Sequence, residues 1–325
     1  MTHSMLEVSH LCTSFFTDRG EVKAVQDVSL RVNKGQVVGI VGESGCGKSM
    51  VARSVMGLIK KPGRVVSGSI VLNGQELTTL DDKELCKVRG RDVSMVFQEP
   101  MTSLNPTMRV GRQVQEVVAI HERIPKDQAR RRTLEILSAV GIPEVEARYD
   151  AYPHELSGGL RQRVMIAMAM VMRPRLLIAD EPTTALDATV EAQIIALLKQ
   201  LVQAGTSVLI ISHNLGVIAQ LADYVYVMYA GRVVEEADVC ELFDNPLHPY
   251  TRGLLGAVSS LRSQSKLLQT IPGVVPNLAD LPAGCSFAPR CDRCMATCGS
   301  VRPELVSVRE GHGLCCHLVK GGDAL

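Results

Sequence analysis

Tryptophan is absent from this 325-residue chain, and aromatic residues make up only 3% of it. Proteins that bind single-stranded nucleic acid stack bases on aromatic side chains, so a stacking platform is not expected here. The formal net charge of +1 gives no electrostatic reason to expect nucleic-acid binding either. The basic cluster Arg130-Arg131-Arg132 is interpreted as a solvated helix face. The composition therefore argues against a nucleic-acid partner.

Long hydrophobic runs are also missing. The longest apolar run, Val164–Met172, is about half of the roughly 20 residues that span a bilayer. The first residues, Met1–Ser4, lack the basic start and the apolar run of a signal peptide. We therefore expect an intracellular protein whose role at a membrane comes through a partner.

Cysteine is unevenly distributed, because six of the ten cysteines lie between residues 285 and 316. In a reducing cytosol such a cluster indicates metal binding more than disulfides. Cys291 and Cys294 have a metal-ligand spacing of their own, and the adjacent Cys315 and Cys316 leave a fourth ligand ambiguous. Four thiolates suit either an iron–sulfur cluster or structural zinc.

A glycine-rich loop, Gly42–Ser49, follows the apolar run Val37–Val41 and precedes a segment of helical character, Met50–Ile59. This strand–loop–helix context is what a P-loop requires. Its backbone N–H groups surround phosphate oxygens at a helix N-terminus. Lys48 is expected to reach the β- and γ-phosphates and Ser49 to ligate Mg²⁺. The predicted phosphate-binding residues are Gly42, Ser44, Gly45, Cys46, Gly47, Lys48 and Ser49.

Much of the remaining sequence predicts an open parallel sheet. The apolar runs Leu176–Ala179 and Val208–Ile211 are compatible with strands buried on both faces. Between them, Val190–Val202 has the spacing of a buried helix stripe, which gives a βαβ pattern. A final hairpin is predicted from Tyr224–Tyr229 and Gly231–Val234 and closes the core near residue 236.

Two segments depart from this pattern. From about residue 99 to 160 the chain is predicted to be mostly helical, with one helix over Lys126–Val140 that Gly141 stops. After residue 240, turns and cysteines dominate, and this part is interpreted as an appended module that does not continue the sheet. The predicted domains are therefore 1–240, with a helical insertion at about 99–160, and 241–325.

Three motifs together resemble the ATP-binding-cassette (ABC) family. Leu156–Arg163 reads Leu-Ser-Gly-Gly-Leu-Arg-Gln-Arg, the run Leu176–Ala179 ends in Asp180-Glu181, and the loop Gly42–Ser49 precedes both. The resemblance implies an α/β fold: a P-loop NTPase (RecA-like) ABC core with an antiparallel β part, a helical insertion subdomain and a small Cys-rich C-terminal module. It also implies ATP and Mg²⁺ as ligands and ATP hydrolysis as the reaction.

The resemblance assigns roles to four further residues. Asp180 would hold Mg²⁺, usually through water, and Glu181 would be the general base that polarises the attacking water. Gln98 matches a glutamine that senses Mg²⁺ and couples to the membrane subunit, and His213 matches the switch histidine that contacts the γ-phosphate. The implied Mg²⁺ residues are Ser49, Gln98 and Asp180, and the implied catalytic residues are Glu181 and His213.

The signature residues Ser157, Gly158 and Gly159 open a predicted helix and so form a second anion-binding N-terminus. In the family, this site closes on the ATP held by a second nucleotide-binding subunit. One chain with one P-loop and one signature therefore implies a dimer. Asp187, in a segment Pro182–Asp187 that resembles the family's D-loop, would lie at the dimer seam.

Two assignments rest on less specific residues. Phe15, or alternatively Phe16, lies where the family places an aromatic ring against adenine, although strand aromatics are commonly core residues. Cys46 within the P-loop is interpreted as a small neutral filler, and the alternative is a thiol whose oxidation blocks phosphate binding.

The tail narrows the resemblance to the ATPases of oligopeptide and dipeptide importers. Residues 248–251 (His-Pro-Tyr-Thr) and 271–276 (Ile-Pro-Gly-Val-Val-Pro) resemble the C-terminal extension of that subfamily, as do Gly284–Phe287 and Arg290-Cys291. In that subfamily four cysteines hold a [4Fe–4S] cluster, with zinc as the alternative here. Carried over by position, the ligands are Cys285, Cys291, Cys298 and Cys316. Cys294 and Cys315 depart from the pattern.

The function implied by the resemblance is that of the ATP-hydrolysing subunit of an ABC importer, a translocase, for di- or oligopeptides or related small solutes, including nickel and glutathione. The expected partners are a second ABC ATPase that forms a heterodimer, two transmembrane permease subunits and an extracytoplasmic solute-binding protein. The expected location is the cytoplasmic face of the cell (inner) membrane, peripheral through the permease subunits.

Two other functions remain as alternatives. A soluble, non-transport ABC ATPase would act on DNA or the ribosome, but such relatives usually carry long coiled-coil insertions or two cassettes in one chain, and this sequence has neither. A regulatory subunit would bind ATP without turnover. Intact Lys48, Asp180, Glu181 and His213 argue against that second alternative.

Overall fold

The computed structural model describes residues 4–184, 186–262 and 271–319. Residues 1–3, which bear on the expected absence of a signal peptide, and Ala185 of the D-loop-like segment lie outside the described residues. The chain divides into two compact units, each described by itself. The first unit is Met1–Met5, Asn33–Gln36 and Thr79–Leu209, and the second unit is Leu6–Val32, Val37–Thr78 and Ile210–Leu325.

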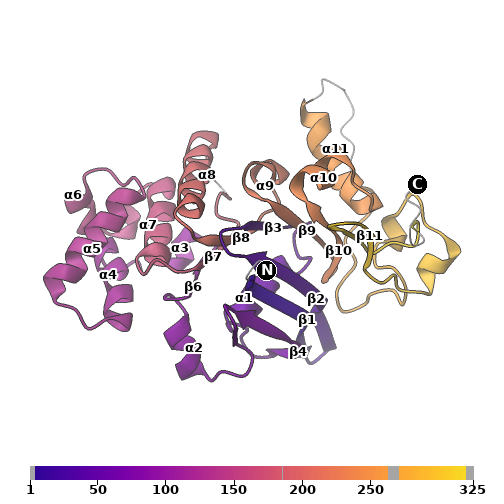
Figure 1. Cartoon of the computed structure of the whole chain (residues 1–325), viewed down its shortest axis with the longest axis horizontal. Coiled ribbons are helices and arrows are strands. Elements are labelled where there is room, and N and C mark those ends of the chain that lie inside the picture. Colours follow the sequence, from indigo (N-terminus) through magenta and orange to yellow (C-terminus); the bar gives the residue numbers. More distant parts are fainter. Residues whose placement is uncertain (1–3, 185, 263–270, 320–325) are drawn as a thin grey trace. The chain divides into compact units, whose positions relative to one another are not determined.

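The elements of both units are labelled in Figure 1. In chain order, the second unit holds β1 (Ser4–Thr17), β2 (Gly20–Asn33), β3 (Val37–Val41), α1 (Lys48–Val55), β4 (Gly63–Leu72), β5 (Gln75–Glu76), α9 (Leu215–Leu221), β9 (Tyr224–Tyr229), β10 (Arg232–Asp238), α10 (Val239–Asp244), α11 (Pro249–Arg262), the 3₁₀ turns η2 (Ala288–Arg290) and η3 (Ala296–Gly299), β11 (Val306–Arg309) and β12 (His312–Leu314). The first unit holds α2 (Asp82–Val88), β6 (Val93–Val96), α3 (Pro100–Ser103), α4 (Val110–His121), α5 (Lys126–Ala139), α6 (Val145–Tyr149), η1 (Pro153–Glu155), α7 (Gly158–Met170), β7 (Leu176–Asp180) and α8 (Ala188–Gln203), and β8 (Ser207–Ile211) lies at the division.

The second unit begins with a four-stranded sheet in the order β2-β1-β4-β5. Strand β1 runs antiparallel to β4, from the pair Leu6–Leu72 to the pair Phe15–Gly63. Leu6, Val8 and Leu11 of β1 are buried. These apolar side chains give the long first strands of the chain one face against the core.

The second unit also contains a mixed set of strands in the order β11-β12-β10-β9-β3. All five residues of β3 are buried, as its uninterrupted apolar sequence predicts, and β3 runs parallel to β9. The predicted hairpin is confirmed, because β9 and β10 pair antiparallel across Ala230-Gly231. Both turn residues have positive φ, 47° and 84°, which suits a two-residue hairpin turn.

The expectation that the sheet ends at this hairpin is wrong. Strand β12 pairs antiparallel with β10, placing Glu235 opposite Leu314, and β11 pairs with β12. The outer edge of β10 presents backbone groups that need partners, and the short hairpin from the tail supplies them. Within the second unit, the C-terminal region is therefore joined to strand β10 by backbone hydrogen bonds.

The first unit combines two parallel strands with a group of helices. Strands β6 and β7 are fully buried and pair in parallel, with Val93 opposite Leu176. Helices α4, α5, α6 and α7 lie together in Figure 1. Helix α5 begins at Lys126 and ends at Ala139, and Gly141 follows with φ 78°, so the predicted helix and its stop are confirmed within one residue.

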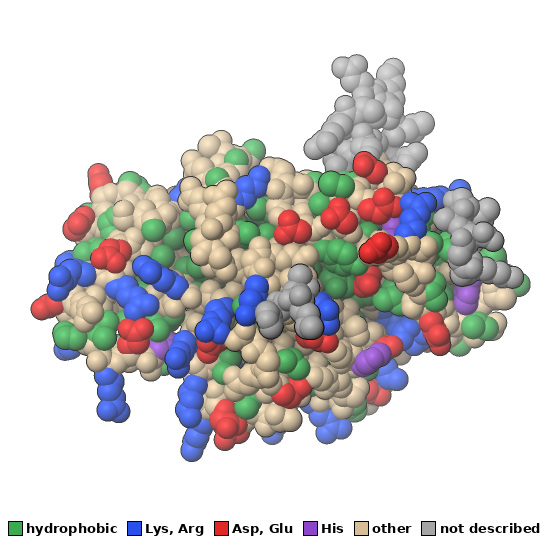
Figure 2. Space-filling model, in the orientation of Figure 1, with side chains coloured by type: hydrophobic (Ala, Val, Ile, Leu, Met, Phe, Trp, Pro, Cys, Tyr) green, Lys and Arg blue, Asp and Glu red, His purple; other side chains and the backbone are tan. Residues whose placement is uncertain are grey.

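Among the described residues, none of the helices has both the length and the apolar character that crossing a membrane requires. On the face of the molecule seen in Figure 2, Lys and Arg side chains are interspersed with Asp and Glu side chains.

Candidate nucleotide-binding site

The glycine-rich loop connects β3 to α1 in the second unit, as its sequence predicts. Gly42 and Gly47 have φ of 151° and 105°. A Cβ atom at Gly42 would collide with the carbonyl oxygen of Met228, and one at Gly47 with that of Ala24. Both positions therefore require glycine, for conformation and for space. Gly47 is also the N-cap of α1, so the loop closes onto a helix N-terminus.

Lys48 is the charge at the centre of this loop. Its side chain is buried, and its ammonium donates hydrogen bonds to the carbonyl oxygens of Gly42, at 2.8 Å, and Glu43, at 3.0 Å. These bonds hold the cation inside the curve of the loop. An anion bound by the loop's backbone N–H groups would meet a positive charge that is already in position.

Cys46 is fully buried within the same loop, 3.9 Å from the ammonium of Lys48. Burial raises the pKa of the Cys46 thiol, and the nearby positive charge of Lys48 opposes this only in part. The residue is therefore a neutral thiol. This favours the interpretation of Cys46 as a small filler over that of a reactive cysteine.

Glu43 is a P-loop residue to which the sequence interpretation gave no role. Its carboxylate accepts two hydrogen bonds from the guanidinium of Arg290, and its backbone N–H donates to the hydroxyl of Tyr250 at 2.8 Å. Tyr250 and Arg290 lie in tail motifs that were noted only as points of resemblance. Those motifs indicated that the two positions matter, but nothing in the sequence indicated their common partner.

Asp180 and Glu181 end strand β7 in the first unit. Asp180 is only 2% exposed, and Glu181 adopts a left-handed backbone with φ 49°. The Glu181 carboxylate accepts a 2.7 Å hydrogen bond from the hydroxyl of Thr184 and a 3.4 Å hydrogen bond from the amide of Gln98. The structure therefore brings together Gln98 and Glu181, which lie 83 residues apart in the sequence. A non-glycine residue in this backbone region is uncommon and points to a functional position.

The signature residues begin helix α7. Ser157 is its N-cap, and its hydroxyl accepts a 3.4 Å hydrogen bond from the N–H of Leu160. A Cβ atom at Gly158 would meet nothing within 4 Å, whereas one at Gly159 would press against Val190 of α8. Gly158 therefore leaves the helix end open to a ligand, and Gly159 allows close packing of α7 and α8.

Asp187 and His213 precede two other helices. Asp187 is exposed and is the N-cap of α8, where it accepts a 2.9 Å hydrogen bond from the N–H of Val190. His213 is exposed and lies immediately before α9, whose N-cap is Asn214. The dimer-seam and switch roles of Asp187 and His213 remain predictions.

The two aromatic candidates differ in their surroundings. Phe15 is part-buried and lies opposite Gly63 in the ladder between β1 and β4. Phe16 is 40% exposed, and the guanidinium of Arg64 lies 4.5 Å from its ring centre. The adenine contact assigned to Phe15, with Phe16 as the alternative, remains a prediction.

The predicted nucleotide-site residues thus fall in both units. Those of the second unit are Phe15, Gly42, Ser44, Gly45, Cys46, Gly47, Lys48, Ser49 and His213. Those of the first unit are Gln98, Ser157, Gly158, Gly159, Asp180, Glu181 and Asp187.

The cysteine cluster lies in the loops of the C-terminal region. The N–H of Cys285 donates to the carbonyl oxygen of Cys298 at 2.8 Å. Burial, together with the neighbouring thiols of Cys285, Cys291 and Cys298, raises the pKa of Cys316 to about 11. Three of the predicted ligands therefore act electrostatically on the fourth. Even so, in the part of the chain that the structure describes, no three His, Cys, Asp or Glu side chains are grouped as a metal would require.

Cys315 and Cys294, which depart from the cysteine pattern of the subfamily, differ in their exposure. Cys315 is buried, and its thiol donates a 3.0 Å hydrogen bond to the carbonyl oxygen of Pro303. Cys294 is exposed.

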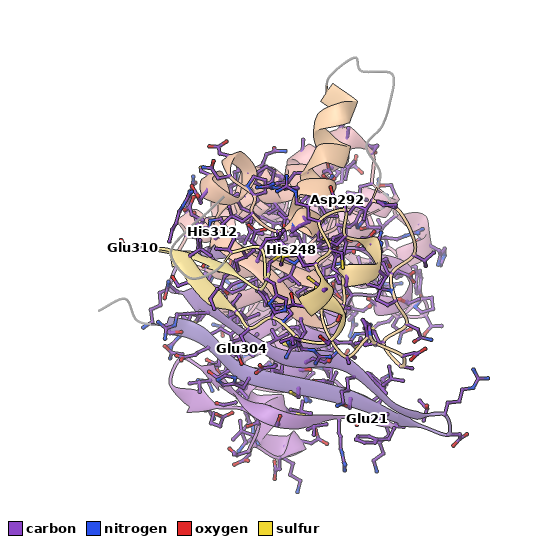
Figure 3. All side chains as sticks on the ribbon, turned by 90° about the vertical axis from the view of Figure 1, so that its right-hand side faces the viewer. Glu21, His248, Asp292, Glu304, Glu310 and His312 are labelled. Carbon is purple, nitrogen blue, oxygen red and sulfur yellow. The ribbon has the colours of Figure 1, made fainter. Side chains whose placement is uncertain are left out.

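A buried polar network anchors the start of α11, and two of its members, His248 and His312, are labelled in Figure 3. The carboxylate of Glu235 accepts N–H bonds from Leu247, at 2.7 Å, and His248, at 3.1 Å, and it lies 2.9 Å from the ring Nε2 of His312. Burial lowers the pKa of His248 to about 4, so this imidazole is neutral. It accepts the N–H of Tyr250 at 3.1 Å and thereby helps to fix the residue that contacts the P-loop.

Comparison with known proteins decides the family. The chain is 47% identical over 317 residues to the oligopeptide transport ATP-binding protein AppD of Bacillus subtilis, covering 97% of each chain. The chain belongs to the ABC transporter family. The family model described as ABC transporter matches residues 25–184, and the model of the oligopeptide/dipeptide transporter C-terminal region matches residues 234–298. The chain is thus a member of the oligopeptide and dipeptide branch of the ABC ATP-binding subunits.

Other relatives agree with this assignment. The oligopeptide transport ATP-binding protein OppD of Escherichia coli K12 is 49% identical over 301 residues, which cover 92% of this chain and 89% of the relative. A solved dimeric structure of the ATP-binding cassette MJ0796 bound to ADP and Pi matches with a TM-score of 0.66 and 28% identity, and covers 72% of this chain and 99% of that one. The ABC ATPase cassette fold, with α/β content and a mixed sheet, is therefore confirmed.

Proposed function

We propose that this chain is the ATP-hydrolysing, nucleotide-binding subunit that powers an ABC importer of di- or oligopeptides or related small solutes. The observation that carries the proposal is similarity over nearly the whole chain to ABC subunits named for oligopeptide transport. The site supports it with a P-loop whose lysine ammonium is held by carbonyl oxygens of the loop itself. The reaction is hydrolysis of ATP with Mg²⁺, coupled to solute import.

Residues of each unit have their own part in this reaction. Lys48 and the P-loop N–H groups bind the phosphates, and the hydroxyl of Ser49 and the carboxylate of Asp180 would hold Mg²⁺. Glu181 accepts a proton from the attacking water. The hydrogen bond from Gln98 to Glu181 supports a role for Gln98 in orienting that base. His213 contacts the γ-phosphate.

A second copy of the site is needed to complete the ATP sandwich. The open helix end at Ser157 and Gly158 binds the γ-phosphate of the ATP held by a partner ATPase, and Asp187 lies at the seam between the two subunits. A relative solved as a dimer supports this arrangement. The partner ATPase is a second, different chain, so the working pair is a heterodimer.

The proposed domain organisation includes a region that would contact the membrane subunits of the importer. Residues 1–240 form the ATPase domain, with a helical insertion over about 99–160 that contains α4 and α5, and residues 241–325 form the C-terminal module. The insertion and the Gln98 region transmit ATP-driven closure to two transmembrane permease subunits. An extracytoplasmic solute-binding protein delivers the solute. The chain is peripheral at the cytoplasmic face of the inner membrane.

A soluble ABC ATPase that acts on DNA or the ribosome is not supported by the comparisons, whose relatives are named for peptide import. The formal net charge of +1 also gives no electrostatic reason to expect a polyanion as partner.

Capture of partners tests the transport assignment. Tagged Glu181→Gln protein with ATP, incubated with gently solubilised native membranes, is expected to retain two polytopic subunits and a second ATPase, because the ATP-bound closed pair persists without turnover. Mass spectrometry identifies the retained chains. Lys48→Ala, which loses the phosphate contact, is the control and is expected to retain less of the second ATPase. Recovery of ribosomes or nucleic acid in place of membrane subunits would contradict the proposal.

The C-terminal cysteines hold a [4Fe–4S] cluster in this proposal, with zinc as the alternative. The donor chemistry fits, since the thiols of Cys285, Cys291 and Cys298 all raise the pKa of Cys316 and a backbone hydrogen bond links Cys285 to Cys298. Among the described residues, no three His, Cys, Asp or Glu side chains lie close enough together to bind a metal ion. A bound cluster would cross-link the loops of the tail.

Metal analysis of the purified chain distinguishes these two possibilities. Protein prepared without oxygen is expected to contain iron and acid-labile sulfide and to absorb broadly near ~400 nm, because thiolate-to-iron charge transfer falls there. Cys298→Ser should lose iron, whereas Cys240→Ser, which changes an exposed cysteine outside the cluster, should retain it. A colourless protein with stoichiometric zinc would contradict the iron–sulfur assignment.

A further inference from the structure

Glu43 brings a negative charge into a loop whose ligand is the most negatively charged part of a nucleotide. It is the second residue of the P-loop and follows Gly42 directly. An unpaired carboxylate there would repel bound phosphates, because like charges a few ångströms apart interact unfavourably, and more strongly where they are buried. The loop therefore needs a means of neutralising Glu43 or turning it aside.

Arg290 of the C-terminal region both neutralises the Glu43 carboxylate and turns it aside. Its two terminal nitrogens lie 2.6 Å and 3.0 Å from the two carboxylate oxygens of Glu43, which is the bidentate geometry of a strong arginine–carboxylate pair. The Arg290 side chain is only 4% exposed, whereas that of Glu43 is 28% exposed. The pair is thus partly shielded from water and is worth more than an exposed ion pair.

The guanidinium of Arg290 is held in place by its own surroundings. Its Nε donates to the carbonyl oxygen of Pro272 at 2.9 Å. Its central carbon lies 5.8 Å from the ring centre of Tyr229 and 6.0 Å from that of Phe287, within reach of cation–π attraction. Arg290 also closes the 3₁₀ turn η2, which fixes its backbone. The orientation of the Arg290 guanidinium is therefore set by contacts within the chain.

Tyr250 holds the backbone of the same loop residue. Its buried hydroxyl accepts the N–H of Glu43 at 2.8 Å. Its ring packs against Tyr229, with centroids 4.7 Å apart, and against Phe287, at 5.4 Å. Because the carbonyl oxygen of Glu43 faces Lys48, all three polar parts of Glu43 are occupied, two of them by residues from the tail.

We propose that Arg290 and Tyr250 are positioning residues of the nucleotide site, through which the C-terminal region sets the shape and charge of the P-loop by holding Glu43. Arg290 neutralises the Glu43 carboxylate and holds it by both oxygens. Tyr250 fixes the start of the loop, so that the following N–H groups face the phosphates. The inference rests on the proposed function, because it assumes that the loop binds ATP.

The test is ATP affinity of the purified full-length chain with Mg²⁺ at low ionic strength, measured with a fluorescent ATP analogue. Arg290→Met is expected to weaken binding by about tenfold or more, since it exposes the nucleotide to an unpaired carboxylate. The double variant Glu43→Gln/Arg290→Met is expected to recover most of that loss. Added salt is expected to reduce the defect of Arg290→Met, because screening weakens the repulsion.

Two further variants separate the roles. Tyr250→Phe is expected to weaken ATP binding several-fold, and adding Glu43→Gln should not restore it, because this bond involves the backbone of Glu43. Arg252→Met is the matched control: Arg252 is an exposed arginine of α11 that bonds the carbonyl oxygen of Pro246. It should bind ATP as the parent does.

The outcomes that overturn the inference are distinct from those that overturn the function. If the parent chain binds ATP and Arg290→Met binds it within twofold as well, Arg290 is not a positioning residue. If Arg290→Met is weak and the double variant is equally weak, Arg290 acts only through the fold. If Arg290→Met does not fold by circular dichroism, Arg290→Lys replaces it, with a smaller loss that Glu43→Gln again restores. Failure of the parent to bind ATP would count against the proposed function instead.

Discussion

Glu181, the proposed general base, has an unusual backbone conformation and two hydrogen-bond donors at its carboxylate. It lies directly after a buried strand and takes a left-handed backbone, which an ordinary loop residue avoids. This geometry turns its carboxylate to the hydroxyl of Thr184 and the amide of Gln98. If Glu181 is the base, as proposed above, these two hydrogen-bond donors give its carboxylate a defined direction, and the left-handed backbone serves to place it.

Replacing Glu181 tests its role as the general base. Glu181→Gln is expected to keep ATP binding and to reduce turnover by roughly 10²–10⁴, the usual contribution of a positioned general base. Steady-state phosphate release with the partner subunits present measures the change. Glu135→Gln, an exposed carboxylate of α5, is the control and should hydrolyse ATP as the parent does. Hydrolysis by Glu181→Gln at a rate near that of the parent would remove Glu181 from the mechanism.

At the residue scale, the sequence was informative where a motif is local. Lys48, Asp180 and Glu181 are recognisable because the neighbouring residues define their strand and loop. Arg290 is not, since its partner Glu43 lies 247 residues away. Side-chain pairing over that distance depends on the tertiary fold, which periodicity and spacing do not contain.

At the scale of elements, the long helix α8 and the buried apolar strands β3, β7 and β8 were predictable, whereas the short strands of the tail were not. Helix α8 covers Ala188–Gln203 and buries the predicted stripe, including Ile194 and Leu198. Helix α1, by contrast, ends at Val55, before the end of the predicted segment, because Gly57 adopts a positive φ of 61°. Strands β11 and β12 have too few residues for an alternating pattern to appear, so the extension of the sheet was missed.

The buried His248 at the start of α11 makes the folding stability depend on pH. His248 is buried and neutral in the fold, with its pKa lowered from 6.5 to about 4 by burial. Below pH 6.5 the unfolded chain binds a proton that the folded chain refuses, so folding stability falls as the pH drops from 6.5 towards 4. The loss reaches on the order of 3 kcal/mol near pH 4.

Urea unfolding at a series of pH values measures this dependence. His248→Gln is expected to be less stable than the parent at pH 7 but to lose less stability between pH 6.5 and 4. His154→Gln, which changes an exposed histidine of the first unit, is the matched control. Equal slopes for the parent and His248→Gln would show that this imidazole is not the group that titrates.

At the scale of the whole molecule, two regions with different similarities share one chain. The solved cassettes cover 72% of the chain, and the oligopeptide/dipeptide C-terminal family model begins at residue 234. The tail adds strands to β10, contributes the cysteine cluster and contacts the P-loop through Tyr250 and Arg290. The C-terminal region is therefore connected both to the sheet and to the candidate nucleotide site.

Peptide uptake tests the central claim most directly. Cells that lack this chain are supplied with the parent protein or with Glu181→Gln at equal abundance, and accumulation of a labelled oligopeptide is measured. The parent is expected to restore uptake and Glu181→Gln to leave it near the level of the deletion, because import depends on ATP turnover by this subunit. Unchanged uptake in the deletion, or full restoration by Glu181→Gln, would contradict the account.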